Sequence, residues 1–145
     1  MTKRFSALAL ALLVTAPSLA TAQSITIRQN FVLPVAPIDA DSFEVVEADG
    51  AGNSQMWCAA GIYARKVLGV QRGDIYVETP RGPSQTMPGR KGVVFTTSPV
   101  DGAFSTVSLS TRRAGLTRSV GHANAVCSQF RDLRIRTGPN TLLRR

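Results

Sequence analysis

The N-terminal segment sets the first limit on what this chain can fold into, because it has the parts of a cleavable secretory signal. Positive charge in Met1–Arg4 is followed by the apolar stretch Phe5–Val14, which is about half as long as a membrane-spanning helix. Ala20 and Ala22 place small residues where a signal peptidase recognises them. We therefore predict cleavage between Ala22 and Gln23, which gives a mature protein in the periplasm or outside the cell.

Single residues exclude two other kinds of export signal. A lipoprotein needs a cysteine directly after the cleavage site, and that position is Gln23. A twin-arginine signal needs paired arginines, whereas this chain has Lys3 and Arg4. No later stretch approaches the roughly 20 apolar residues of a transmembrane helix. The mature chain, residues 23–145, is therefore expected to be one small soluble domain without a membrane anchor.

The two cysteines, Cys58 and Cys127, do not belong to CxxC motifs. In an oxidising compartment an even pair is most simply a disulfide, and a single histidine is too few for a four-ligand zinc site. A cross-link between residues 69 positions apart would reduce the conformational entropy of the unfolded chain by an amount worth about 4 kcal/mol. We predict a Cys58–Cys127 disulfide, with no metal and no cofactor.

A cysteine nucleophile is the alternative for the same residues. Cys58 falls near the start of a predicted helix, where the helix dipole favours a thiolate, and His122 is the only imidazole that could act as a base. The sequence Met56–Ala60 lacks the signature that surrounds the nucleophile in known cysteine hydrolases. An envelope cysteine hydrolase using Cys58 and His122 is therefore the second functional hypothesis.

Periodicity and capping residues predict two helices. The first runs from Ser54 to Leu68 with Asn53 or Ser54 as N-cap, and the second covers 120–131 with Ser119 as N-cap. Cys58 and Cys127 each fall within one of these helices, so the disulfide would join helix to helix. Cys58 lies away from the main apolar face of the first helix, which predicts a second contact on that flank.

Alternation and turn residues predict a mostly antiparallel sheet of about four to five strands. Residues 31–37 are expected to be a proline-limited connection, 81–92 a loop, and the acidic side chains of 42–47 a solvent face. With both helices on one face of the sheet, the predicted class is α+β. The expected strands are 24–28, 42–47, 74–79, 92–97 and 104–110, the last two forming a hairpin.

Charge is unevenly distributed along the mature chain, which carries 15 basic and 9 acidic residues. A cationic side in the C-terminal part would favour anionic partners such as lipid head groups or acidic polysaccharide. Nucleic acid is not expected, because aromatic residues do not alternate with the arginines to stack on bases. The alternative is that these arginines are merely solvated. The candidate binding residues are Arg112, Arg113, Arg134, Arg136, Arg144 and Arg145.

Arg90 and Lys91 lie beside glycines in the expected loop 81–92, a combination that could suit a phosphate. The spacing does not match GxxxxGK[ST], and the prolines remove backbone N–H donors. A surface loop, or a loop that contacts another protein, is therefore the expectation.

Four short features carry a resemblance to other proteins. They are Trp57–Ala60 at the first helix start, Arg81–Ser84, Pro88–Lys91 and the late Cys127. With them the chain resembles small uncharacterised exported proteins of Gram-negative bacteria. The resemblance implies a periplasmic compartment and this architecture, and it carries over no activity. The leading expectation is a non-enzymatic binding or structural module of the cell envelope, whose partner is an anionic envelope component or another periplasmic protein.

Overall fold

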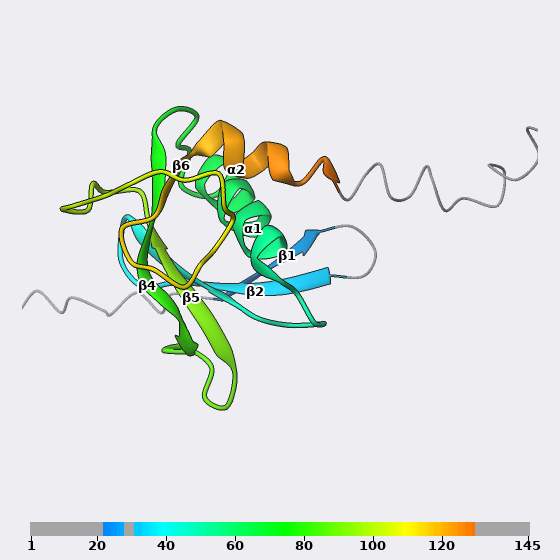
Figure 1. Ribbon diagram of the computed structural model, residues 1–145. Helices are drawn as coiled ribbons and strands as arrows, with labels where there is room; N and C mark the ends of the chain where they lie inside the picture. Colours follow the sequence, from blue (N-terminus) through cyan, green and yellow to red (C-terminus); the bar gives the residue numbers. More distant parts are fainter. Residues whose placement is uncertain (1–21, 28–30, 130–145) are drawn as a thin grey trace, which may run out of the picture.

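The computed structural model describes residues 22–27 and 31–129. Residues 1–21 of the predicted signal peptide, and Arg134, Arg136, Arg144 and Arg145 of the basic tail, lie outside the described residues. The described part is an α+β fold with a six-stranded antiparallel sheet, which confirms the predicted class with one strand more than expected (Figure 1). Two helices, α1 (Asn53–Lys66) and α2 (Val120–Val126), complete it.

The sheet order is β1-β2-β3-β5-β4-β6, so neighbours in the sheet are not always neighbours in the chain. Helix α1 connects β3 to β4, and β5 lies between these two strands. Short β6 closes the sheet beside β4 and leads directly into α2. The strands are β1 (Gln23–Ile27), β2 (Phe31–Pro37), β3 (Ser42–Val46), β4 (Asp74–Pro83), β5 (Lys91–Thr96) and β6 (Thr117–Ser119).

Helix α1 packs across one face of the sheet and buries its aromatic residues there (Figure 1). The Trp57 ring meets Phe95 of β5 edge-on at 5.0 Å between centroids, and Tyr63 lies 4.5 Å from Phe43 of β3. The helix begins after Gly52, whose N–H donates to Gln55 Oε1 at 3.0 Å, rather than at the predicted caps. Asn53, one of those predicted caps, instead accepts a hydrogen bond from Thr111 Oγ1 at 2.9 Å.

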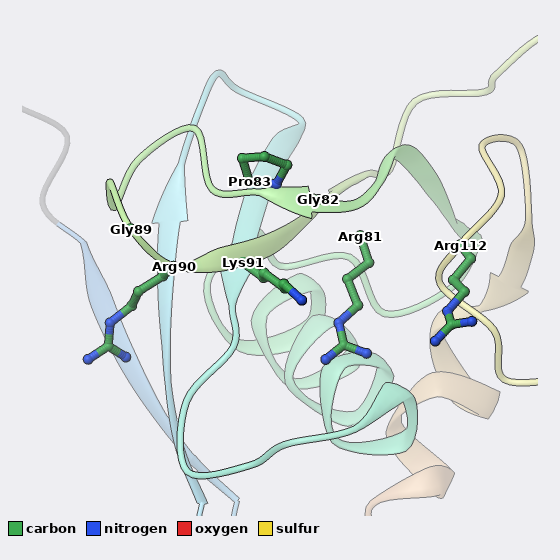
Figure 2. A pocket seen from close by; sticks show the side chains of 7 residues that line it. All are labelled: Arg81, Gly82, Pro83, Gly89, Arg90, Lys91 and Arg112. Carbon is green, nitrogen blue, oxygen red and sulfur yellow. The ribbon is translucent and has the colours of Figure 1, made fainter.

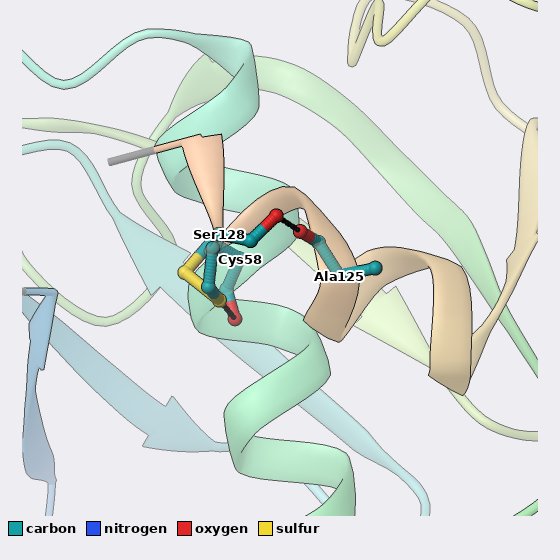
Figure 3. The surroundings of a disulfide bond; sticks show 4 residues. Cys58, Ala125 and Ser128 are labelled. Atoms are coloured by element: carbon teal, nitrogen blue, oxygen red, sulfur yellow. Dashed lines mark hydrogen bonds between the residues drawn. A yellow bond between two sulfur atoms is a disulfide. The ribbon is translucent and has the colours of Figure 1, made fainter. Parts of the chain in front are cut away.

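The far flank of α1 contacts α2, as the position of Cys58 predicted. Cys58 and Cys127 form a disulfide with 5.0 Å between their Cα atoms, which confirms the predicted pairing (Figure 3). Close approach is possible because Gly61 has no side chain: a Cβ there would lie 2.5 Å from the backbone nitrogen of Asn124. The predicted cap Ser119 is also confirmed, because its Oγ accepts from the His122 N–H at 3.1 Å.

Strand β2 corrects the expectation that 31–37 is only a proline-limited connection between strands. Proline cannot donate to a strand ladder, but both prolines of β2 lie where a neighbouring strand has ended. The pairing with β3 covers only 35–37, so β3 does not reach Pro34. The pairing with β1 stops at Val35, so β1 does not reach Pro37.

The predicted hairpin was wrong: 92–97 forms a strand as expected, but its hairpin partner is β4 and not 104–110. Strand β5 pairs with β3 and β4, and β4 continues past Pro80 to Pro83 through two register shifts. The segment 104–110 forms no strand; only Phe104 makes an isolated bridge, to Leu116. Its carbonyls are instead bound by side chains: Arg118 binds those of Thr106 and Ser108.

Among the described residues, no helix has the length and apolarity to cross a membrane.

Candidate anion-binding site

The β4–β5 hairpin carries one side of an open pocket of about 810 Å³. Basic side chains dominate its wall, and they come from two parts of the chain: the hairpin and the segment before β6. In Figure 2, Lys91 and Arg81 project in the same direction from neighbouring strands, Arg112 stands beyond Arg81, and Arg90 reaches out at the opposite end. The pocket is lined by Arg81, Gly82, Pro83, Gly89, Arg90, Lys91 and Arg112.

Backbone pairing brings these residues together. Pro83 pairs with Lys91 at the end of the hairpin, so the strand that carries Arg81 runs beside the strand that carries Lys91. The Arg81 N–H donates to the Thr111 carbonyl at 2.9 Å, which places Arg112 next to the hairpin. Residues 31 positions apart in sequence thus share one wall.

A buried carboxylate supports the loop between β4 and β5. Glu44 of β3, expected on a solvent face, is only 1% exposed, and this corrects that prediction. Its oxygens accept hydrogen bonds from the Ser84 hydroxyl, from the Gln85 N–H, and from the N–H and hydroxyl of Thr86, at 2.5–2.9 Å. Burial of a carboxylate is tolerable when several donors surround it. Glu44 therefore fixes the loop whose far end carries Arg90.

One acidic residue borders the pocket wall. Glu47 Oε2 accepts from Arg81 Nε at 3.0 Å and lies 2.5 Å from Arg81 Nη2, and both side chains are about one quarter exposed. Among the described residues, Arg90, Lys91 and Arg112 form no ion pair, and all three are exposed. The described wall thus holds four cations against one carboxylate.

The arginines predicted to bind an anion do not all lie at this pocket. Arg112 lines the pocket, whereas Arg113 stacks on the ring of Phe104, with its guanidinium carbon 4.6 Å from the ring centre. The other four predicted arginines lie outside the described residues. Sequence analysis did not place Arg81, Arg90 and Lys91 in an anion site, although the two basic motifs that flank one glycine–proline loop were a usable signal.

The residues of the cysteine-nucleophile hypothesis are not arranged for that chemistry in this state. Cys58 is fully buried, and its sulfur is bonded to Cys127. The side chain of His122 is exposed at the start of α2. Within 22–27 and 31–129, no group of three or more His, Cys, Asp or Glu side chains could hold a metal ion.

Fold and site together define a small disulfide-linked α+β domain with a cationic pocket at one hairpin. Comparisons of the chain with protein-family models, with curated proteins and with solved structures give no match.

Proposed function

We propose that the mature chain is an exported, non-enzymatic binding module of the cell envelope that holds an anionic partner at the β4–β5 pocket. The observation that carries the proposal is that Arg81, Arg90, Lys91 and Arg112 line one pocket, and that among the described residues only Arg81 of these four is paired with a carboxylate, that of Glu47. The positive potentials of clustered cations add, so an anion that contacts several of them is attracted more strongly than by any single side chain.

The side-chain types support recognition by charge. Arginine offers a planar fork of donors that fits carboxylate and phosphate oxygens, and lysine adds a compact positive charge. No aromatic residue of the described part of the chain lines the pocket, so stacking on a sugar or base has no support among these residues. The favoured partner is therefore an anionic head group or acidic polymer.

Two observations support export. Strand β1 begins at Gln23, so cleavage after Ala22 would leave every strand of the sheet intact. The Cys58–Cys127 disulfide suits an oxidising compartment. Protein recovered from the envelope is expected to have the mass of residues 23–145, and a mass that retains Phe5–Val14 would contradict the proposal.

The binding test compares two charge-matched triple variants of the mature protein. Arg90→Gln, Lys91→Gln and Arg112→Gln remove three cations from the pocket. Arg65→Gln, Lys66→Gln and Arg72→Gln remove three exposed cations from elsewhere and serve as the control. Binding to vesicles with anionic lipid and to acidic polysaccharide is measured from low to physiological salt, where the screening length is about 8 Å.

The pocket variant is expected to lose about tenfold or more in affinity, and the control much less, because net charge changes equally in both. Equal losses would show that overall charge, and not this pocket, is responsible. Absence of binding by the unmodified protein at low salt would end the proposal.

A third variant separates the pocket from the C-terminal tail. Arg134, Arg136, Arg144 and Arg145 are replaced together by Gln, and the same titrations are repeated. If the pocket is the main site, this variant retains most of its affinity. Loss confined to this variant would place the binding in the tail, as the sequence alone suggested, and would contradict the role of the pocket.

A further inference from the structure

We propose that Glu47 is an internal competitor at this site: it holds Arg81 in the absence of ligand, and a phosphate group binds by replacing the Glu47 carboxylate on Arg81. The inference rests on the proposed anion-binding function and names the chemical class of the ligand. It also gives a specific role to Glu47, whose carboxylate pairs with one cation of the pocket wall.

The geometry of the ion pair leaves Arg81 available to a second anion. Nε and Nη2 of Arg81 both lie against the same oxygen, Glu47 Oε2, at 3.0 and 2.5 Å. A guanidinium has five N–H donors, so this contact uses only part of its fork. The side chains of Arg81 and Glu47 are 24% and 23% exposed, which leaves the pair open to solvent and to an incoming ligand.

The backbones on either side of the pair are fixed, so only side chains need to move. Glu47 follows β3, and its N–H donates to the Lys91 carbonyl at 2.8 Å. Arg81 lies on β4, and its N–H donates to the Thr111 carbonyl at 2.9 Å. Carboxylate and guanidinium therefore approach each other across β5 from its two neighbouring strands.

A displaced Glu47 carboxylate has open space beside it. A second hollow of about 380 Å³ shares Arg90 and Lys91 with the first, and it is also lined by Glu47 and Asp49. A rotation of Glu47 toward this hollow would release Arg81 and keep the carboxylate near positive charge. A partly exposed ion pair contributes little net free energy, because solvent screens it, so its opening is not prohibitive.

Phosphate is the ligand chemistry that gains most from this exchange. A ligand carboxylate would only replace one two-oxygen anion by another on Arg81. A terminal phosphate has three acceptor oxygens and up to two negative charges, so it can contact Arg81 while other oxygens face Lys91 or Arg112. The wall supplies these cations from three separate positions along the chain.

The test is a double-mutant cycle on the mature protein, with inorganic phosphate as the probe and calorimetry at low salt as the measurement. The variants are Glu47→Gln, Arg81→Gln and the double variant. If Glu47 competes for Arg81, Glu47→Gln raises phosphate affinity by about fivefold, the scale of one exposed ion pair. The same change in the Arg81→Gln background should then alter the affinity by less than about twofold.

The cycle distinguishes competition from simple charge repulsion. If Glu47 only repels anions, its replacement gives the same gain with or without Arg81, and the inference fails while the proposed function stands. Asp49→Asn is the matched control: it removes a carboxylate that lines the neighbouring hollow without contacting Arg81, and it should change affinity little. A gain equal to that of Glu47→Gln would likewise overturn the inference.

Two further probes define the ligand. Acetate is expected to bind more weakly than phosphate, and equal binding would contradict the phosphate assignment. Glycerol 3-phosphate is compared with vesicles of phosphatidic acid in phosphatidylcholine: stronger binding to the soluble probe identifies a free phosphorylated ligand, and stronger binding to vesicles identifies a lipid head group. If phosphate, acetate and vesicles all fail to bind any variant at low salt, the inference and the proposed function fail together.

Discussion

The Glu44 carboxylate occupies the place that a side chain on Gly92 would need: a Cβ on Gly92 would lie 2.2 Å from Glu44 Oε1. Glu44 lies on β3 and Gly92 on the adjacent strand β5, so the glycine opens a path from the middle of the sheet to the β4–β5 loop. The carboxylate reaches Ser84 and Thr86 along this path. Four hydrogen bonds hold it there, so it cannot move aside freely.

Gly92→Ala is expected to destabilise the fold by about 1–3 kcal/mol, the usual effect of overpacking a filled site. The loss should be much smaller in a Glu44→Ala background, because the conflicting carboxylate is then gone. Gly82→Ala on the partner strand is the control, since its Cβ would meet its nearest neighbour at 3.6 Å, an ordinary contact. Urea unfolding measures all four variants, and additive losses in Gly92→Ala and Glu44→Ala would contradict this account.

Gly61 and Gly121 form a second matched pair, because both are glycines within helices and only one is crowded. Alanine normally favours a helix over glycine by about 1 kcal/mol. At Gly121 nothing lies within 4 Å of an added Cβ, so Gly121→Ala should be neutral or stabilising. At Gly61 the new Cβ would meet the α2 backbone at 2.5 Å, so Gly61→Ala should lower the thermal midpoint. Two similar midpoints would show that α2 is free to shift.

Local signals explain which parts of the fold the sequence predicts well. The face of α1 that bears Trp57, the Ser119 cap and the Cys58–Cys127 disulfide all follow from residue types and spacing within one helix or one pair. The segment 104–110 misleads because Val107 and Leu109 alternate with serines and so imitate a strand. Its carbonyls are bound by Arg118 and by the Trp57 indole N–H, two side chains whose positions depend on the finished fold.

The candidate site could be predicted only in part, because its contacts are long-range. Glu44 has the pattern of a solvent-facing strand residue, and the hydroxyl and N–H groups that allow its burial come from 40 to 42 residues later. Arg112 was singled out by its place in an arginine-rich segment. Its proximity to Arg81 depends on the register of β4 with β5 and on the hydrogen bond from Arg81 N–H to Thr111.

The disulfide is expected to be fully formed in exported protein and to contribute about 4 kcal/mol to stability. Non-reducing peptide mapping should recover Cys58 and Cys127 in one linked fragment, and alkylation of the native protein should label neither. Replacement of both cysteines by alanine should lower the free energy of unfolding by about that amount. A Cys58 thiol that reacts in native protein would contradict this prediction and would support the hydrolase hypothesis.

Tyr63 predicts a loss of stability at alkaline pH. Tyr63 packs against Phe43 and is only 2% exposed. Burial raises the pKa of its hydroxyl above the ordinary value of about 10. Above that pH the unfolded chain releases the phenolic proton while the folded chain retains it. The contribution of protonated Tyr63 to the free energy of unfolding is therefore complete below about pH 10 and is lost as pH rises through the folded-state pKa.

The measurement is urea unfolding between pH 8 and pH 11 for the unmodified protein, Tyr63→Phe and the control Tyr76→Phe. Tyr63→Phe should show a shallower alkaline loss, because phenylalanine has no proton to release. Tyr76→Phe should keep the steeper loss. Identical slopes in the two variants would show that other groups dominate the alkaline transition.

Arg118 is a buried cation without a carboxylate partner among the described residues. It is 4% exposed, its Nη2 donates to the carbonyls of Thr106 and Ser108, and its Nε has no hydrogen-bond partner within 22–27 and 31–129. The guanidinium carbon lies 5.7 Å from the centre of the Trp57 ring. Burial lowers the pKa of Arg118, which reflects the unfavourable removal of its charge from water.

Two substitutions at Arg118 separate its charge from its hydrogen bonds. Arg118→Met removes both, and since loss of the buried charge offsets loss of the bonds, the free energy of unfolding should change by less than about 1–2 kcal/mol. Arg118→Lys keeps a charge but not the planar fork that spans two carbonyls, so it should be the less stable variant. In both, amide hydrogen exchange should accelerate in residues 106–112 while the amides of β5 stay protected, because the segment loses its anchor and the sheet does not. A lysine variant more stable than the methionine variant would show that the charge itself, and not the shape of the guanidinium, holds this segment.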